Sequence, residues 1–358
     1  MMVFYPFIYR WILVVVIFIG YFRADPAGAE GLDAPAAKTV DPSFSPSWIN
    51  PALRRTYENA RAQARKWLDT LEVDPIKLRQ QGIKGKKKLA EILDAYLTLY
   101  EYTSNPEDRT NILHRVKELV AVTARPEYHN LKYIPPTEFN QDSTSYLRVC
   151  YLMDQFSLPT GDYRRQIQAI LPELNAHMKE RGVWQRKVFA FYYDYFSLPK
   201  PPILQQESQV KGVIAGRLPL SQYNKDLAYD LTHEVFNAYE YGHRKISSGF
   251  NPEDREYLRK TIIPLLDRSL AEGDVDLGAE LISCLTYLGM QDEAIYQPAI
   301  LYLLHSQNKD GTWGHYEDIR AEIGNLVDQH LYLHTTLVVL QSLVEAFDGN
   351  WPTYSRTK

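Results

Sequence analysis

Apolar residues recur at steps of three and four positions over most of the chain. The clearest runs are Leu89, Ile92, Leu93, Tyr96, Leu97 and Tyr100, followed by Ile112, Leu113, Val116, Leu119 and Val120. This spacing brings apolar side chains to one face of an α-helix, where they pack against a core. No segment alternates apolar and polar residues for the length of a β-strand. The pattern therefore predicts an all-α protein.

The same spacing predicts further helices in the rest of the chain. They are expected over 143–158, 163–181, 184–196, 220–241, 253–272, 276–289, 292–306 and 328–347. Short turns that contain Pro or Gly separate them, as at Pro159 and Gly161. About a dozen helices joined by such turns are expected to pack as antiparallel pairs. We therefore expect a single α-helical domain over 52–358.

The five-residue sequence Asn-Pro-Glu-Asp-Arg occurs twice, starting at Asn105 and at Asn251. An asparagine side chain accepts a hydrogen bond from the free N–H groups of a first helical turn, and the proline that follows has no N–H to satisfy. The two acids favour the positive end of the helix dipole. Both copies are therefore predicted to cap helices, which requires no catalytic role.

A turn near the C-terminal end carries a motif that bears on the arrangement of the helices. It contains Gln307, then Asp310-Gly311 and Trp313-Gly314. The segment resembles the QW-type turn of α/α toroids such as terpene cyclases, and similar strings occur in secreted α/α-barrel polysaccharide lyases. The resemblance implies an α/α toroid, a barrel of antiparallel helix pairs, in which the Gln caps a neighbouring helix and the Trp stacks beneath it. An open α-solenoid is the alternative.

The first thirty residues have the layout of a secretory signal peptide. A short segment ending at Arg10 precedes an apolar run over 11–22, and Ala27-Gly28-Ala29 follows. The run is shorter than the roughly 20 residues that cross a bilayer. We predict a signal peptide over 1–29, a linker over 30–51 and a periplasmic or secreted protein. The alternative is a domain tethered to the membrane by residues 11–22.

The charge balance argues against nucleic acid as a partner. The chain has a net charge of −4, which becomes −5 after the predicted cleavage, whereas nucleic-acid binding needs a clustered basic surface. One basic run, over 84–88, is interpreted as a solvated helix face, with a polyanion or membrane surface as the alternative. The Gly-rich phosphate loops of nucleotide-binding proteins are absent from the sequence, so no nucleotide cofactor is expected.

Cys150 and Cys284 are the two cysteines of the chain, and both lie in apolar helical segments. In an oxidising compartment they form a disulfide only if the fold brings their Cα atoms within about 7 Å. We favour the alternative, two buried small apolar residues, because free cysteine is among the most buried residue types.

Two histidines near the C-terminus form a candidate metal site. His330 and His334 lie four residues apart, so their rings share one face of a helix and are able to bind a common divalent metal or substrate. An apolar run follows His334. The alternative is therefore a buried histidine that is hydrogen-bonded to a backbone carbonyl.

His233 and Glu280 are the other candidate catalytic residues, together with His334. His233 stands among apolar neighbours, where a polar ring needs a partner. Asp276 and Glu280 share one helix face, and Glu280 lies a turn deeper, where burial raises the pKa of a carboxyl. Asp274 is interpreted as a helix cap. The sequence Asp274-Val275-Asp276-Leu277 lacks the last acid of the D-x-D-D motif of class II terpene cyclases, so protonation-initiated cyclisation is a minor option.

Aromatic residues supply the candidate ligand-binding positions. A dense aromatic block runs over 184–196 and includes Tyr192 and Tyr193. Tyrosine combines a flat apolar face with a hydroxyl, which suits sugars and other amphipathic ligands. Trp313 and His315 in the QW-type turn are added to the predicted ligand-binding set. The alternative for the aromatic block is a packed core.

These observations lead to two hypotheses of function. The first is an exported α/α-toroid enzyme that uses His233, Glu280 and His334 for acid/base or metal-assisted chemistry of the lyase, hydrolase or cyclase type. Its expected substrate is a saccharide or another amphipathic molecule. The second is a non-catalytic ligand-binding or scaffold protein.

Overall fold

The computed structural model describes residues 46–73, 85–205, 211–242, 245, 249–315 and 330–352. Within these residues there are fourteen α-helices and six short 3₁₀ turns, and no β-strand. The prediction of an all-α protein is therefore confirmed. The predicted signal peptide over 1–29 and most of the predicted linker lie outside the described residues.

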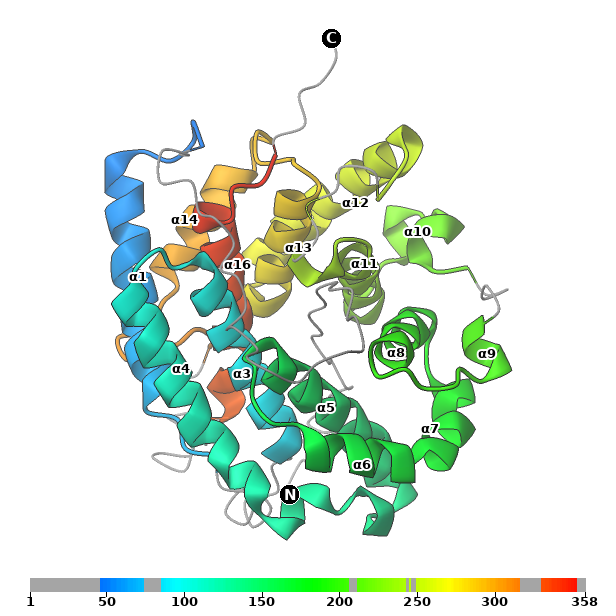
Figure 1. Cartoon of the computed structure of the whole chain (residues 1–358). Helices are drawn as coiled ribbons and strands as arrows, with labels where there is room; N and C mark the ends of the chain where they lie inside the picture. Colours follow the sequence, from blue (N-terminus) through cyan, green and yellow to red (C-terminus); the bar gives the residue numbers. More distant parts are fainter. Residues whose placement is uncertain are drawn as a thin grey trace, which may run out of the picture.

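Six helices lie around the middle of Figure 1. They are α3 (Gly85–Tyr102), α5 (Pro136–Gln155), α8 (Val183–Tyr195), α11 (Lys225–Ala238), α13 (Val275–Tyr287) and α16 (His330–Asp348). We call them the central helices. Helix α3 contacts both α5 and α16, α13 contacts α16 and α11, and α11 contacts α8. Helices α5 and α8 meet through aromatic rings, with Tyr151 and Phe191 separated by 5.7 Å.

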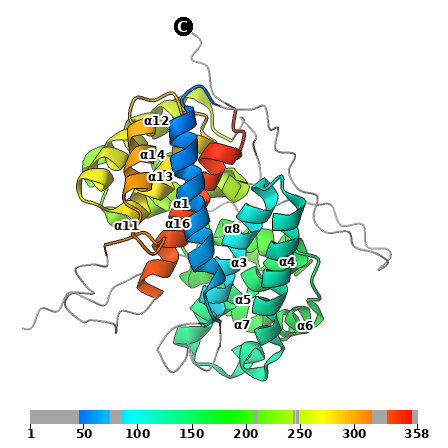
Figure 2. The ribbon, with the colours of Figure 1, turned by 90° about the vertical axis from the view of Figure 1, so that its left-hand side faces the viewer.

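The remaining α-helices lie farther from the middle of the picture. They are α1 (Pro51–Asp69), α4 (Pro106–Val120), α6 (Gly161–Ala169), α7 (Leu171–His177), α9 (Pro202–Gln205), α10 (Val213–Gly216), α12 (Pro252–Ala271) and α14 (Tyr296–His305). Each of α1, α4 and α12 contacts a central helix, namely α16, α3 and α13. Figure 2 shows α1 alongside α16.

Helix α13 is more completely buried than the outer helices α1 and α4, and the sequence explains why. Every residue of α13 is buried except Asp276, which is half-buried, whereas α1 and α4 bury one face only. A helix that is apolar on all sides needs neighbours all around it, while an amphipathic helix leaves its polar face to water. Polar side chains of α13 are therefore largely enclosed by protein and need partners there.

Both predicted caps are confirmed. The side chain of Asn105 accepts a hydrogen bond from the N–H of Glu107 at the start of α4, at 2.9 Å. The side chain of Asn251 accepts one from the N–H of Asp254 at the start of α12, at 2.8 Å. In each helix the proline occupies the first turn, where its missing N–H costs nothing.

The QW-type turn connects three helices. The Gln307 side chain donates a hydrogen bond to the carbonyl of Ala60, at 2.8 Å, which lies in the middle of α1 and not at its end. The indole N–H of Trp313 donates to the carbonyl of Leu303 in α14, at 2.7 Å, and its backbone N–H donates to Thr336 in α16, at 3.0 Å. Gln307 thus braces the side of a helix, which corrects the capping role that the resemblance implied.

Gly311 in this turn is expected to tolerate no side chain. Its φ is +91°, and a Cβ atom there would lie 2.5 Å from the carbonyl oxygen of Gln63 in α1. The substitution Gly311→Ala is expected to lower the free energy of unfolding by about 2–4 kcal/mol in urea denaturation. The control is Gly182→Ala, because no atom lies within 4 Å of a Cβ at Gly182. Equal losses in the two variants would contradict this account of the turn.

Two predicted helix spans need correction. The predicted helix over 163–181 is divided between α6 and α7, because Pro172 in the first turn of α7 has no N–H for a continuous helix. The predicted helix over 220–241 is also shorter. Its first residues form a 3₁₀ turn, and α11 begins after Asn224, whose side chain caps it.

The described part of the basic run, over 85–88, is not a solvated face. Lys86 and Lys88 are buried, and the ammonium group of Lys86 lies 2.8 Å from the amide oxygen of Asn130 and 3.2 Å from a carboxylate oxygen of Asp142. Lys87 pairs with Glu91 at 3.4 Å. The run starts a central helix, so its side chains serve as counter-charges inside the protein. This placement corrects the prediction from sequence.

Cys150 and Cys284 are both buried and form no disulfide. Burial raises the pKa of each thiol well above its usual range. The favoured interpretation, two buried small residues, is therefore confirmed.

The described part of the chain starts slightly before the predicted domain boundary at residue 52. Ile49 is buried, and the ring of Trp48 packs edge-on against Tyr296 and Phe347, at 5.3 and 5.2 Å. The last residues of the predicted linker therefore belong to the core. Among the described residues, no helix combines the length and the hydrophobicity needed to cross a bilayer.

Candidate active site

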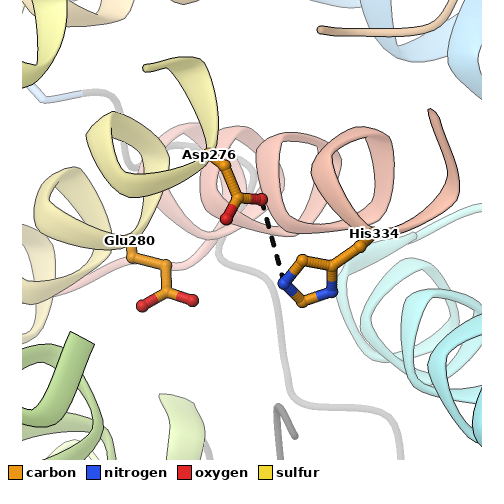
Figure 3. A group of neighbouring side chains, drawn as sticks. All are labelled: Asp276, Glu280 and His334. Atoms are coloured by element: carbon orange, nitrogen blue, oxygen red, sulfur yellow. Dashed lines mark ion pairs between the residues drawn. The ribbon is translucent and has the colours of Figure 1, made fainter. Parts of the chain in front are cut away.

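Three ionisable side chains from two central helices meet inside the protein. Helix α13 supplies Asp276 and Glu280, one turn apart, and α16 supplies His334. One carboxylate oxygen of each acid and one ring nitrogen of His334 lie within 4.8 Å of one another. Figure 3 shows the three side chains pointing into one space. We call these three residues the carboxylate–histidine cluster.

The start of α13 sets the position of both acids. The Asp274 side chain accepts a hydrogen bond from the N–H of Leu277 at 3.3 Å and so caps the helix, as predicted. Lys225 of α11 pairs with Asp274 at 2.5 Å. Asp276 then falls in the first turn and Glu280 four residues later on the same face. Glu280 is 1% exposed, in agreement with the expectation of a buried acid.

Each member of the cluster contacts a polar group on a central helix other than its own. The Thr232 hydroxyl of α11 donates to Glu280 Oε2 at 2.5 Å, and the Tyr229 hydroxyl of the same helix donates to Asp276 Oδ2 at 2.6 Å. Glu91 Oε1 of α3 lies 3.2 Å from His334 Nδ1. One polar atom of every side chain is thereby fixed by the surrounding protein.

The other polar atom of each side chain has no hydrogen-bond partner within the described residues. These atoms are Asp276 Oδ1, Glu280 Oε1 and His334 Nε2, and all three are buried. Asp276 Oδ1 and His334 Nε2 are 3.8 Å apart. Buried polar atoms without partners are costly, and each needs an explanation such as a bound ligand, ion or water molecule.

The electrostatics of the cluster follow from its burial. Burial, reinforced by the charge of Asp276, raises the pKa of Glu280 to about 8. Burial alone would lower the pKa of His334, but the carboxylates of Asp276 and Glu91 outweigh it and raise that pKa. Burial would raise the pKa of Glu91, but Lys87 and His334 hold it at about 2. The imidazole is thus the main positive charge facing the two acids of the cluster.

His233 lies next to Glu280. Its Nδ1 is 3.8 Å from Glu280 Oε2 and 2.7 Å from the carbonyl of Tyr229, to which it donates. The side chain is fully buried, and its ring lies 4.4 Å from that of Trp184. The structure thus brings the predicted catalytic residues together, because both His233 and His334 lie near Glu280.

The side chain of His330, the predicted partner of His334 in a metal site, is not among the described side chains, although its backbone starts α16. Asp276 and Glu280 are the residues grouped with His334 in a geometry that could hold a metal.

The predicted ligand-binding aromatics are core residues. Tyr192 and Tyr193 are both fully buried, and the hydroxyl of Tyr193 donates to the side chain of Asn175 at 2.7 Å. Trp313 is also fully buried and holds the QW-type turn. These rings have no face left for a ligand, which corrects the prediction. His315 is exposed, and its Nε2 lies 2.6 Å from the carbonyl of Gly273, just before α13.

Sequence reasoning missed Glu91 and a buried ion pair beside it. Asp94 of α3 pairs with Arg148 of α5, and the two side chains are 2% and 1% exposed. The charge of Arg148 also lowers the pKa of Glu91. A signal was present, because Glu91 and Asp94 are acids inside a helix whose other faces are apolar. Such acids must face partners within the core.

The fold and the site define an all-α protein with a buried carboxylate–histidine cluster among its central helices. Residues 58–340 match the family described as Domain of unknown function (DUF6895), and the chain belongs to this family. The matched region contains the whole cluster together with Glu91 and His233. No curated protein and no solved structure matches the chain.

Proposed function

We propose that this protein is an exported α/α-toroid enzyme whose catalytic centre is the carboxylate–histidine cluster. The contacts of the central helices support a ring, because α16 packs against α3 and so connects the last helix to the first of the six. A ring of this kind encloses a central space, where ligand sites of helical proteins form. Export is supported by the apolar run over 11–22 and by Ala27-Gly28-Ala29.

The observation that carries the proposal is the meeting of Asp276, Glu280 and His334, each with one buried polar atom that lacks a hydrogen-bond partner within the described residues. Three such atoms gathered in one place are accounted for by a bound ligand or ion. Carboxyl and imidazole groups are the usual proton donors and acceptors in enzymes. We assign them acid/base or metal-assisted chemistry of the lyase, hydrolase or cyclase type, on a saccharide or another amphipathic substrate. His233 acts as a positioning residue behind Glu280.

Turnover by matched variants tests the proposal. The full chain is screened against a panel of polysaccharides and glycosides, and Glu280→Gln and His334→Ala are compared with it on any substrate found. Loss of at least 100-fold in kcat with an unchanged helical circular dichroism spectrum is expected, since general acid/base groups contribute about 10²–10⁴-fold. The controls are Glu118→Gln and His114→Ala, a surface pair whose charged atoms lie 3.4 Å apart.

Two results would count against an enzyme centred on this cluster. One is full turnover in both cluster variants. The other is saturable ligand binding by the wild-type chain with no product from any ligand that it binds, which would establish a non-catalytic binding protein.

A further inference from the structure

We infer that the carboxylate–histidine cluster is a binding site for one transition-metal dication, with Asp276, Glu280 and His334 as its ligands. This inference names a metal cofactor for the catalytic site of the proposed function, and it rests on that proposal for the location of the site. It does not need turnover, because ion binding is measurable on its own. From the sequence, His330 is the predicted metal-binding partner of His334, whereas the structure groups His334 with the two acids of α13.

In each side chain of the cluster, one polar atom has a partner in the protein and the other has none within the described residues, which points to a bound ion. In protein metal sites each ligand side chain commonly uses one atom for the metal and another for an outer hydrogen bond that fixes its orientation. All three members of the cluster have this division. Thr232, Tyr229 and Glu91 contact one atom of each side chain, and the second atom has no hydrogen-bond partner in the described part of the chain.

Glu91 gives His334 the orientation that a metal ligand needs. Nδ1 of the imidazole pairs with Glu91 Oε1 at 3.2 Å, which leaves Nε2 as the atom that faces Asp276. A carboxylate on the outer nitrogen of a ligating histidine fixes the tautomer and raises the basicity of the inner nitrogen. A bound cation takes the place of the proton on Nε2.

Charge balance also favours a dication. The two acids carry two negative charges when both are ionised, and this matches one divalent ion. The nearby charge of Glu91 is balanced mainly by Lys87, which pairs with it at 3.4 Å.

The donor set selects the class of ion. Imidazole nitrogen suits Zn²⁺ and other first-row transition metals, whereas Ca²⁺ and Mg²⁺ prefer oxygen ligands alone. Zn–O and Zn–N bonds of about 2.0–2.2 Å require the donor atoms to approach by roughly 1 Å from their present separations. Three protein ligands leave one position open for water or substrate, as in catalytic zinc sites.

Ion binding by the full chain tests the inference. The purified protein is stripped with EDTA and titrated with Zn²⁺, and in parallel with Mn²⁺, by isothermal calorimetry, with bound metal counted by mass spectrometry. One ion per chain is expected, with affinity on the order of 100-fold weaker in Glu280→Gln and in His334→Ala. Asp276→Asn serves in place of either variant that fails to fold. The controls are Glu118→Gln and His114→Ala, which alter the surface histidine–glutamate pair.

The inference is overturned if the stripped wild-type chain binds neither ion, or if the cluster variants bind as tightly as the controls. Its failure is distinct from that of the proposed function. Full turnover by the ion-free protein would refute the metal site and leave the proposed enzyme function standing. One tightly bound ion, with no turnover of any ligand that the protein binds, would refute the enzyme function and leave the metal site standing.

Discussion

Replacing Arg148 with methionine is expected to lower the free energy of unfolding by about 3–5 kcal/mol, the cost of leaving a buried charge without its partner. Arg148 is 1% exposed and pairs with Asp94, which is 2% exposed. Methionine fills a similar volume but supplies no charge. Asp94 is then left buried and uncompensated between α3 and α5. Urea denaturation followed by circular dichroism measures the loss.

A second substitution distinguishes the stability lost through the unpaired charge from the stability lost through changed packing. In the double variant Arg148→Met with Asp94→Leu, both charges are absent and most of the lost stability is expected to return, because an apolar pair can replace a buried ion pair. Arg165→Met removes one member of the exposed pair with Asp162 and is expected to change stability little. If the double variant is no more stable than Arg148→Met, the ion pair does not explain the loss.

The second large effect is expected from Glu91→Gln, and it rests on the inferred metal site. The substitution should weaken Zn²⁺ binding by about 10–100-fold, the range typical of outer hydrogen-bond partners of ligating histidines. Glutamine is able to donate from its amide to His334 Nδ1, which moves the ring proton to Nε2 and blocks the atom that faces Asp276. It also lacks the negative charge that favours a ligating imidazole. Calorimetric titration of the EDTA-stripped variant measures the change.

The control for this prediction is Glu118→Gln, because Glu118 also pairs with a histidine, His114, but on the surface and away from the cluster. That variant should bind Zn²⁺ like the wild type. A structural role for Glu91 alone would lower the melting temperature of the ion-free protein and leave the Zn²⁺ affinity unchanged. Such a result would contradict the positioning role.

The helices and their caps could be predicted from the sequence because they depend on local chemistry. Apolar spacing, the asparagines at 105 and 251 and the glycines and prolines of the turns act over a few residues. The break at Pro172 was also a local signal, but the continuing apolar spacing on both sides of it obscured it. The burial of Lys86 and Lys88 depends on what packs around α3, and a run of lysines says nothing about that.

About half of the candidate site was predictable for the same reason. Asp276 and Glu280 share a face because they are four residues apart on one helix. Their meeting with His334 depends on how α13 packs against α16, which a single sequence does not encode in any short pattern. Tyr192 and Tyr193 were predicted to bind a ligand but are buried in the core. Aromatic density fits a core as well as a ligand site, and only the packing of α8 distinguishes the two.

The central claim is that Asp276, Glu280 and His334 share one ligand inside the protein. Anomalous diffraction from crystals of the full chain grown with Zn²⁺, recorded on both sides of the zinc absorption edge, tests it most directly. We expect one anomalous peak between α13 and α16, with the three side chains bonded to it at about 2.0–2.2 Å. No peak at this position, or His334 turned away from the two acids, would contradict the account.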